Sequence, residues 1–290
     1  MDCLCKGFSN RTKINLVFAD VTETANVLGQ RHRCGRSSAD VLAEALCAIG
    51  LLSANLRQRD EKISLQLKVD GPVGGCMVEA SMNGHLRGYT NQKMLNGSES
   101  GDSLNRLDVL GSQGLMRVIQ ANTTHIISNS LVTATPPDMK SALARFYNES
   151  LQRPTAVELF VSTTDGNINR AVGLMVQRMP EGIAENFVPV LERFNDNSVH
   201  DALADITDPG QLNTLLGLDD LVQKMSRELS FGCSCSREKM SAALAALPTK
   251  DLRDMVEKGE PQSTTCHFCA ETYIFTPQGL EAMMNDIRTG

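Results

Sequence analysis

The sequence predicts an α+β protein: a mainly antiparallel-sheet N-terminal domain with packed helices, then a helical linker, then a small C-terminal domain. Hairpin signals join most of the strands expected in residues 1–180, which favours antiparallel pairing. After Pro180 the chain breaks into short amphipathic stretches up to residue 230. Residues 231–290 are too few to bury a large core, and they contain four closely spaced cysteines. We therefore expect domains over 1–180 and 231–290, joined by a linker over 181–230.

The first elements of the N-terminal domain follow from hydrophobic periods and caps. Residues 1–11 predict a loose tail in which Cys3 and Cys5 are incidental thiols, and residues 14–19 predict a strand. Asp20 and Glu23 form a capping-box pattern that starts a short helix over 21–28. The clearest helix follows, because apolar residues at steps of three and four predict one buried stripe: Val41, Leu42, Ala45, Leu46, Ile49, Leu52 and Leu56.

Alternating apolar and polar residues predict the remaining strands of this domain. Asn83-Gly84 is a strong hairpin signal between two of them. Residues 91–105 predict a long surface loop, and Thr135-Pro136 predicts the start of a helix that ends near residue 151. The expected strands cover residues 63–69, 76–80, 86–90, 115–120, 125–133, 156–163 and 168–178.

The segment 181–230 contains no stretch long enough to form a stable helix alone. Its amphipathic stretches must pack against a neighbour or stay loose, so we expect a conditionally ordered linker; they cover residues 183–194, 199–206, 211–216 and 221–225. In residues 231–290, Ser236 caps a helix with Met240, Leu244 and Leu247 on one face. Pro248-Thr249 begins a second helix, residues 273–275 form a strand, and Thr276-Pro277 begins a final helix.

Composition argues against several classes of function. A net charge of −6 and an aromatic content of 4% without tryptophan argue against a nucleic-acid-binding surface. The sequence has no run of about 18 apolar residues and no signal-peptide core, so we expect no membrane partner. Nine cysteines, an odd number, without an export signal indicate a reducing, cytoplasmic location. No convergent acid–base or nucleophile motif is present, so we do not expect an enzyme.

Four cysteines carry the strongest chemical signal in the chain. Cys233 and Cys235 form one tight pair, Cys266 and Cys269 form another, and residues 236–265 separate the pairs. Two such pairs are typical of a tetrahedral zinc site with four thiolate ligands. We therefore expect one zinc ion per chain in a closed site, which leaves no open position for hydrolytic chemistry. His267 lies between two better-placed thiols, and we do not expect it to replace one.

Such a site has two interpretations, because a zinc-bound sulfur is a thiolate, the form that oxidants attack. Zinc binding supplies on the order of 10–16 kcal/mol of folding free energy in small domains. Oxidation of Cys233–Cys235 or Cys266–Cys269 to a disulfide would release the metal. Each disulfide closes a very short loop and therefore replaces little of the stability that the metal supplied. The terminal domain is then expected to unfold. The alternative is a purely structural site, which is the commoner use of paired cysteines.

With these residues in view, the chain resembles the redox-regulated 33-kDa heat-shock chaperone family, also called the 33-kDa chaperonin. The resemblance extends over nearly the whole chain, and the cysteine motif is its most specific part. The segment 181–230 matches poorly. The matching segments are Cys233-Ser234-Cys235-Ser236-Arg237-Glu238, Cys266-x-x-Cys269, Leu51-Leu52-Ser53-Ala54-Asn55-Leu56, Asp70-Gly71-Pro72, and Gly173-Leu174-Met175-Val176-Gln177 with Met179-Pro180.

The resemblance implies a cytoplasmic, ATP-independent holdase. In the reduced state, Cys233, Cys235, Cys266 and Cys269 would bind zinc and the protein would be inactive. Oxidants would form the disulfides Cys233–Cys235 and Cys266–Cys269 and release zinc. The linker would then unfold, apolar surface would become exposed, and the protein would form a homodimer and capture unfolding client proteins.

This sequence departs from the family pattern at two points. Ala270 stands where the family usually has glycine, which would tighten or shift the turn. Five further thiols open alternative disulfides on oxidation: Cys3, Cys5, Cys34, Cys47 and Cys76.

Two other classes of protein are alternatives to the holdase. A zinc-ribbon nucleic-acid-binding or regulatory protein is the alternative, but basic and acidic residues balance between the two cysteine pairs, which disfavours phosphate binding. A thioredoxin-type oxidoreductase is disfavoured because no Cys-x-x-Cys opens a helix after a strand.

Overall fold

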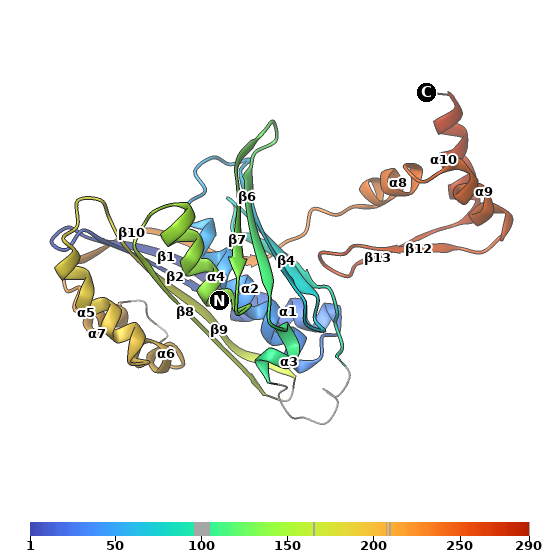
Figure 1. Cartoon of the computed structure of the whole chain (residues 1–290). Coiled ribbons are helices and arrows are strands. Elements are labelled where there is room, and N and C mark those ends of the chain that lie inside the picture. Colours follow the sequence, from blue (N-terminus) through green and yellow to red (C-terminus); the bar gives the residue numbers. More distant parts are fainter. Residues whose placement is uncertain (96–104, 165, 207, 209, 290) are drawn as a thin grey trace. The chain divides into compact units, whose positions relative to one another are not determined.

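The structure, a computed structural model, describes residues 1–95, 105–164, 166–206, 208 and 210–289 (Figure 1). The chain divides into two compact units, Met1–Gly232 and Cys233–Gly290, and each is described by itself. Most of the loop predicted over 91–105 lies outside the described residues.

A five-stranded antiparallel sheet forms one layer of the N-terminal unit (Figure 1). Its order is β10, β1, β2, β9, β8, with bounds Leu221–Glu228, Cys3–Ser9, Ile14–Asp20, Asn167–Arg178 and Thr155–Thr164. The predicted strand over 14–19 and the hairpin of the last two predicted strands are confirmed.

The loose tail predicted over residues 1–11 is wrong. Residues Cys3–Ser9 form β1, which pairs with β2 on one side and with β10 on the other. Leu4 is fully buried. The strand is stable because both edges are hydrogen-bonded, and one of those partners lies far later in the sequence. That partner, β10, includes the stretch 221–225, where we expected a helical segment of the linker.

A six-stranded sheet forms the second layer. Its pairs are antiparallel except for the short parallel pair of β11 with β5. The predicted Asn83-Gly84 hairpin is confirmed, and Gly84 has a φ of +83°, which glycine adopts without strain. The strand order is β11, β5, β4, β3, β6, β7, with bounds Ser230–Phe231, His85–Thr90, Gly75–Ser81, Lys62–Val69, Gly114–Ala121 and Ile126–Ala134.

Two helices pack against both sheets: α1 (Thr22–His32) and α2 (Arg36–Ser53). Helix α2 is buried on nearly every side rather than along one stripe, because strands of both sheets contact it. At the start of α1 the carboxylate of Asp2, not a capping box, accepts the backbone N–H groups of Glu23 and Thr24.

The helix predicted from Thr135-Pro136 begins later, at Met139, where the side chain of Asp138 caps it. It consists of α4 (Met139–Arg145) and the π-helical turn η2 (Phe146–Ser150), and a further short helix, α3, covers Arg106–Leu110.

The five-stranded sheet has one face toward α1 and α2, and three short helices cover its opposite face (Figure 1). These helices are α5 (Ala184–Asn195), α6 (Ser198–Leu203) and α7 (Gln211–Leu216). Alternate residues of β2 and β9 face them: Ile14, Leu16, Phe18, Val172, Leu174 and Val176. The residues between these, such as Val17 and Met175, belong to the main core. The two central strands are therefore buried on both faces, and the segment 181–230 supplies one of the covers.

The C-terminal unit is thinly packed. It contains α8 (Arg237–Ala245), α9 (Thr249–Glu257), a hairpin of β12 (Gln262–Thr265) and β13 (Thr272–Phe275), and α10 (Pro277–Thr289). Apart from cysteines, its buried apolar side chains among the described residues are Leu252, Phe275, Leu280 and Met284. Helix α8 has no buried residue, so the apolar face predicted for it does not form a core.

The α+β fold class with antiparallel sheets is confirmed. Within the described residues, no helix has the length and apolar content needed to cross a bilayer.

Candidate metal centre

The four predicted cysteines lie on two loops of the C-terminal unit. Cys233 and Cys235 precede α8, whose first turn is capped by Ser236. Cys266 and Cys269 lie in the turn of the β12–β13 hairpin. The N–H of Cys266 donates to the carbonyl of Glu271 at 2.8 Å, and the N–H of Ala270 donates to the carbonyl of Cys266 at 2.9 Å. These bonds fix the turn that presents both sulfur atoms on one side.

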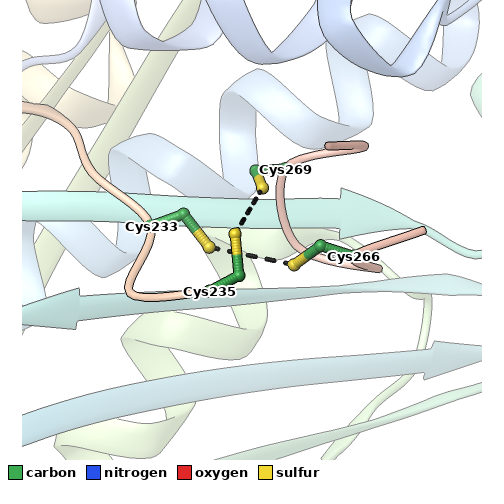
Figure 2. Close-up of side chains that lie close together, drawn as sticks. All are labelled: Cys233, Cys235, Cys266 and Cys269. Atoms are coloured by element: carbon green, nitrogen blue, oxygen red, sulfur yellow. Dashed lines mark hydrogen bonds between the residues drawn. The ribbon is translucent and has the colours of Figure 1, made fainter. Parts of the chain in front are cut away.

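The four sulfur atoms converge (Figure 2). All lie within 4.8 Å of one another, with Cys233 Sγ 3.8 Å from Cys266 Sγ and Cys235 Sγ 3.4 Å from Cys269 Sγ. A tetrahedral zinc ion with Zn–S bonds of about 2.3 Å requires sulfur–sulfur edges of about 3.8 Å. The group fits such an ion. His267 does not belong to the group.

Burial and backbone donors act in opposite directions on these thiols. Burial raises the pKa of Cys266, while the backbone N–H groups of Phe268 and Cys269 lower it. Burial likewise raises the pKa of Cys269, while the backbone N–H of Glu271 lowers it. Burial outweighs the backbone donors, so the pKa of both thiols is raised overall, and the thiolate form requires a cation beside the sulfur atoms.

A tyrosine adds a contact that the sequence analysis missed. The hydroxyl of Tyr273 donates to Cys235 Sγ at 3.2 Å, so it orients this ligand from outside the group of four. The sequence predicted only a short strand that includes Tyr273. The closeness of Tyr273 to Cys269 along the chain, on the strand that follows the cysteine turn, could have indicated that its hydroxyl lies near the cysteines.

The geometry of Ala270 explains why this position favours glycine. Its φ is +58°, in the left-handed region that costs most residues energy. The chain therefore carries local backbone strain directly after the second cysteine pair.

The remaining five cysteines lie in the N-terminal unit, and all nine are free thiols. Cys47 and Cys76 are buried. Cys3 and Cys5 are next-but-one neighbours on β1 and interact through their thiols, and this hydrogen bond lowers the pKa of Cys5 and raises that of Cys3.

Together, the fold and the four cysteines define an α+β protein with a small C-terminal unit that can hold a metal ion. The family described as Hsp33 protein matches residues 2–276, and the chain belongs to this family.

Similar proteins cover the same length. The 33 kDa chaperonin of Lacticaseibacillus paracasei is 30% identical over 98% of this chain and 98% of its own. That of Synechococcus sp. (strain JA-3-3Ab) is 28% identical over 99% and 91%. The crystal structure of the 33 kDa chaperonin (heat shock protein 33 homolog) from Thermotoga maritima has a TM-score of 0.89 at 21% identity, covering 100% of this chain and 99% of that chain. The likeness in structure supports the fold.

Proposed function

We propose that this chaperone-family protein is a redox-regulated, ATP-independent holdase that binds unfolding proteins after its zinc-bound cysteines are oxidised. The observation that carries the proposal is the convergence of four thiols in a unit with almost no apolar core. Such a unit depends on its metal for folding, and the ligands are the atoms that oxidants attack.

In the reduced protein, Cys233, Cys235, Cys266 and Cys269 hold one zinc ion. Four protein ligands close the site, so the ion acts as a structural staple rather than as a Lewis acid. The zinc ion would keep the sulfur atoms anionic, because burial raises the pKa of Cys266 and Cys269 despite the backbone donors of the turn. The hydroxyl of Tyr273 orients Cys235.

Oxidation by hydrogen peroxide removes two electrons from each pair of thiolates and forms one disulfide. The peroxide takes up these electrons and two protons from water and becomes two molecules of water, and zinc leaves as the divalent ion. We propose the pairs Cys233–Cys235 and Cys266–Cys269. All four sulfurs lie within 4.8 Å, so proximity alone does not select the pairing, and the proposal rests on the likeness to the family. Short disulfide loops do not replace the lost metal, and the C-terminal unit unfolds.

The client surface that we propose is the face of the five-stranded sheet beneath α5–α7. This face presents Phe18, Leu174 and their apolar neighbours in β2 and β9. The covering helices have only 12, 6 and 6 residues, too short to be stable without the sheet. The segment 181–230 thus acts as a conditionally ordered linker between domains over 1–180 and 231–290. Release of its helices α5–α7 exposes an apolar surface, and the activated protein forms a homodimer in the cytoplasm.

A light-scattering assay tests the proposal. A client unfolded by heat or denaturant is diluted with reduced protein, or with protein treated with peroxide at mildly raised temperature, without ATP. We expect zinc release and suppressed aggregation only after oxidation. Cys34→Ser, a change outside the metal group, should behave as wild type, whereas Cys266→Ser should lose zinc without oxidant. Unchanged client aggregation after full zinc release would contradict the holdase function.

A further inference from the structure

A cavity of about 710 Å³ opens in the N-terminal unit beside the C-terminal end of α2. Its walls come from β1, from the loop after α2, from the β6–β7 hairpin and from the segment that joins η2 to β8. Cavities of roughly 300–1,000 Å³ are typical of sites for small organic ligands. None of the four cysteines and none of the apolar residues beneath α5–α7 lines this cavity, so neither feature explains it.

Three cationic side chains from separate elements line this cavity: Lys6 on β1, Arg57 after α2 and Arg153 before β8. Lys6 is half-buried, and both its burial and the two guanidinium groups lower the pKa of its ammonium group. In the part of the chain that the structure describes, none of the three forms an ion pair with a carboxylate. Arg57 and Arg153 are exposed, whereas Lys6 is half-buried, so an anion bound beside Lys6 would offset both its burial and its repulsion by the two arginines.

One carboxylate lines the cavity, and it is already engaged. Glu61 is 4% exposed, and its Oε2 accepts the backbone N–H of Arg57 at 2.8 Å and the Nε2 of Gln120 at 3.0 Å. Glu61 therefore holds the loop after α2 against β6. The three cations against this one carboxylate leave an excess of two positive charges in the lining.

The rest of the lining is divided between polar and apolar groups. Asn55 and Ser128 offer amide and hydroxyl groups, while Ile127, Phe146 and Leu151 offer an apolar wall. A ligand that satisfies both parts has an anionic group for the cations and an apolar group for the wall. An inorganic anion would contact only the polar part of the lining.

We propose that this cavity binds a small organic phosphate, a dianionic phosphate ester with an apolar substituent. The phosphate group offers three acceptor oxygens for the three cations, and its two charges balance the excess in the lining. Guanidinium groups bind phosphate oxygens in pairs, and the lysine adds a point charge. The apolar substituent lies against the wall formed by the β6–β7 hairpin and η2.

Calorimetric titration of the reduced, full-length protein with phenyl phosphate and with inorganic phosphate tests this proposal. The two probes share the anionic group and differ only in the apolar ring. At low ionic strength we expect saturable binding of one phenyl phosphate per chain, at least about fivefold tighter than inorganic phosphate because the ring is buried. Added salt should weaken binding. No saturable binding, or equal affinity for the two probes, would overturn the proposal.

Charge-removing variants locate the binding. Lys6→Gln and Arg153→Gln should each weaken phenyl phosphate about tenfold, since each removes a charged hydrogen-bond donor. Lys224→Gln is the matched control, because Lys224 is an exposed lysine on β10 that does not line the cavity. Arg153 is exposed, so its variant is expected to fold, and thermal unfolding checks both. Phenyl phosphate should raise the unfolding temperature of the wild type more than that of the cavity variants. Unchanged affinity in both cavity variants, or an equal loss in Lys224→Gln, would refute the site.

Discussion

Replacing Ala270 by glycine should strengthen the metal centre. A left-handed backbone conformation costs an L-residue roughly 1–2 kcal/mol, and Ala270 has a φ of +58°. Glycine avoids this strain but loses roughly 0.5–1 kcal/mol more backbone entropy on folding. The two ranges leave a net gain of up to about 1.5 kcal/mol, with a central value of about 0.75 kcal/mol. Under the proposed coupling of zinc binding to folding of the C-terminal unit, zinc should bind about two- to fivefold tighter.

Competition with a coloured zinc chelator measures this gain in the full-length, reduced protein. Ala270→Gly should retain zinc at two- to fivefold higher chelator concentration than wild type. Ala243→Gly is the matched control, because Ala243 is an exposed position inside α8 where glycine costs about 1 kcal/mol. The two substitutions should therefore change zinc retention in opposite directions. Weaker zinc binding in Ala270→Gly would refute the argument from backbone strain.

Three further substitutions or reactions test other parts of the structure. Tyr273→Phe removes the hydroxyl that donates to Cys235, so zinc should bind about fivefold weaker in the same chelator assay. Leu203→Ala should cost about 2–5 kcal/mol of packing under α6, and the reduced protein should bind a hydrophobic dye and be cleaved faster by protease within residues 181–230. The thiol of Cys5, whose pKa is lowered by its hydrogen bond with Cys3, should react with iodoacetamide at neutral pH faster than an ordinary thiol, measured by mass spectrometry.

Controls separate each effect from general destabilisation. Leu131→Ala, at a side chain that is 63% exposed on β7, should change neither dye binding nor proteolysis. Cys3→Ser should alter the alkylation rate of Cys5 if the thiol–thiol hydrogen bond sets its reactivity. A Tyr273→Phe protein with wild-type zinc affinity would show that this hydroxyl does not support the ligand.

Local patterns predicted most strands because their partners are near in sequence. The alternation around Leu65 and the Asn83-Gly84 turn specify hairpins within a few tens of residues. Strand β1 was not predicted, because its short sequence is stabilised by pairing with β2 and also with β10. Strand β10 lies more than 200 residues later in the sequence. The burial of α2 on nearly every side was also not predicted. The spacing of apolar residues along the chain shows one buried stripe, whereas contact with a sheet on each side buries the rest of the helix.

The sequence predicted the four ligand candidates because their chemistry depends on spacing that is visible along the chain. It missed the contact of Tyr273 with Cys235, because a hairpin must first bring β13 beside the other cysteine loop. The cationic cavity was also invisible, since Lys6, Arg57 and Arg153 come from three segments that only the tertiary fold joins.

Burial of β2 and β9 on both faces has a calorimetric consequence. The helices α5–α7 pack on one face, while α1, α2 and the second sheet retain the other. Loss of the helices therefore leaves the main core and the strand pairing intact. Heating should then divide unfolding into separate cooperative steps, with a small early heat absorption from the helical cover and a larger one from the core. The apolar sheet face would therefore become exposed in the first transition, before the main core absorbs most of the heat of unfolding.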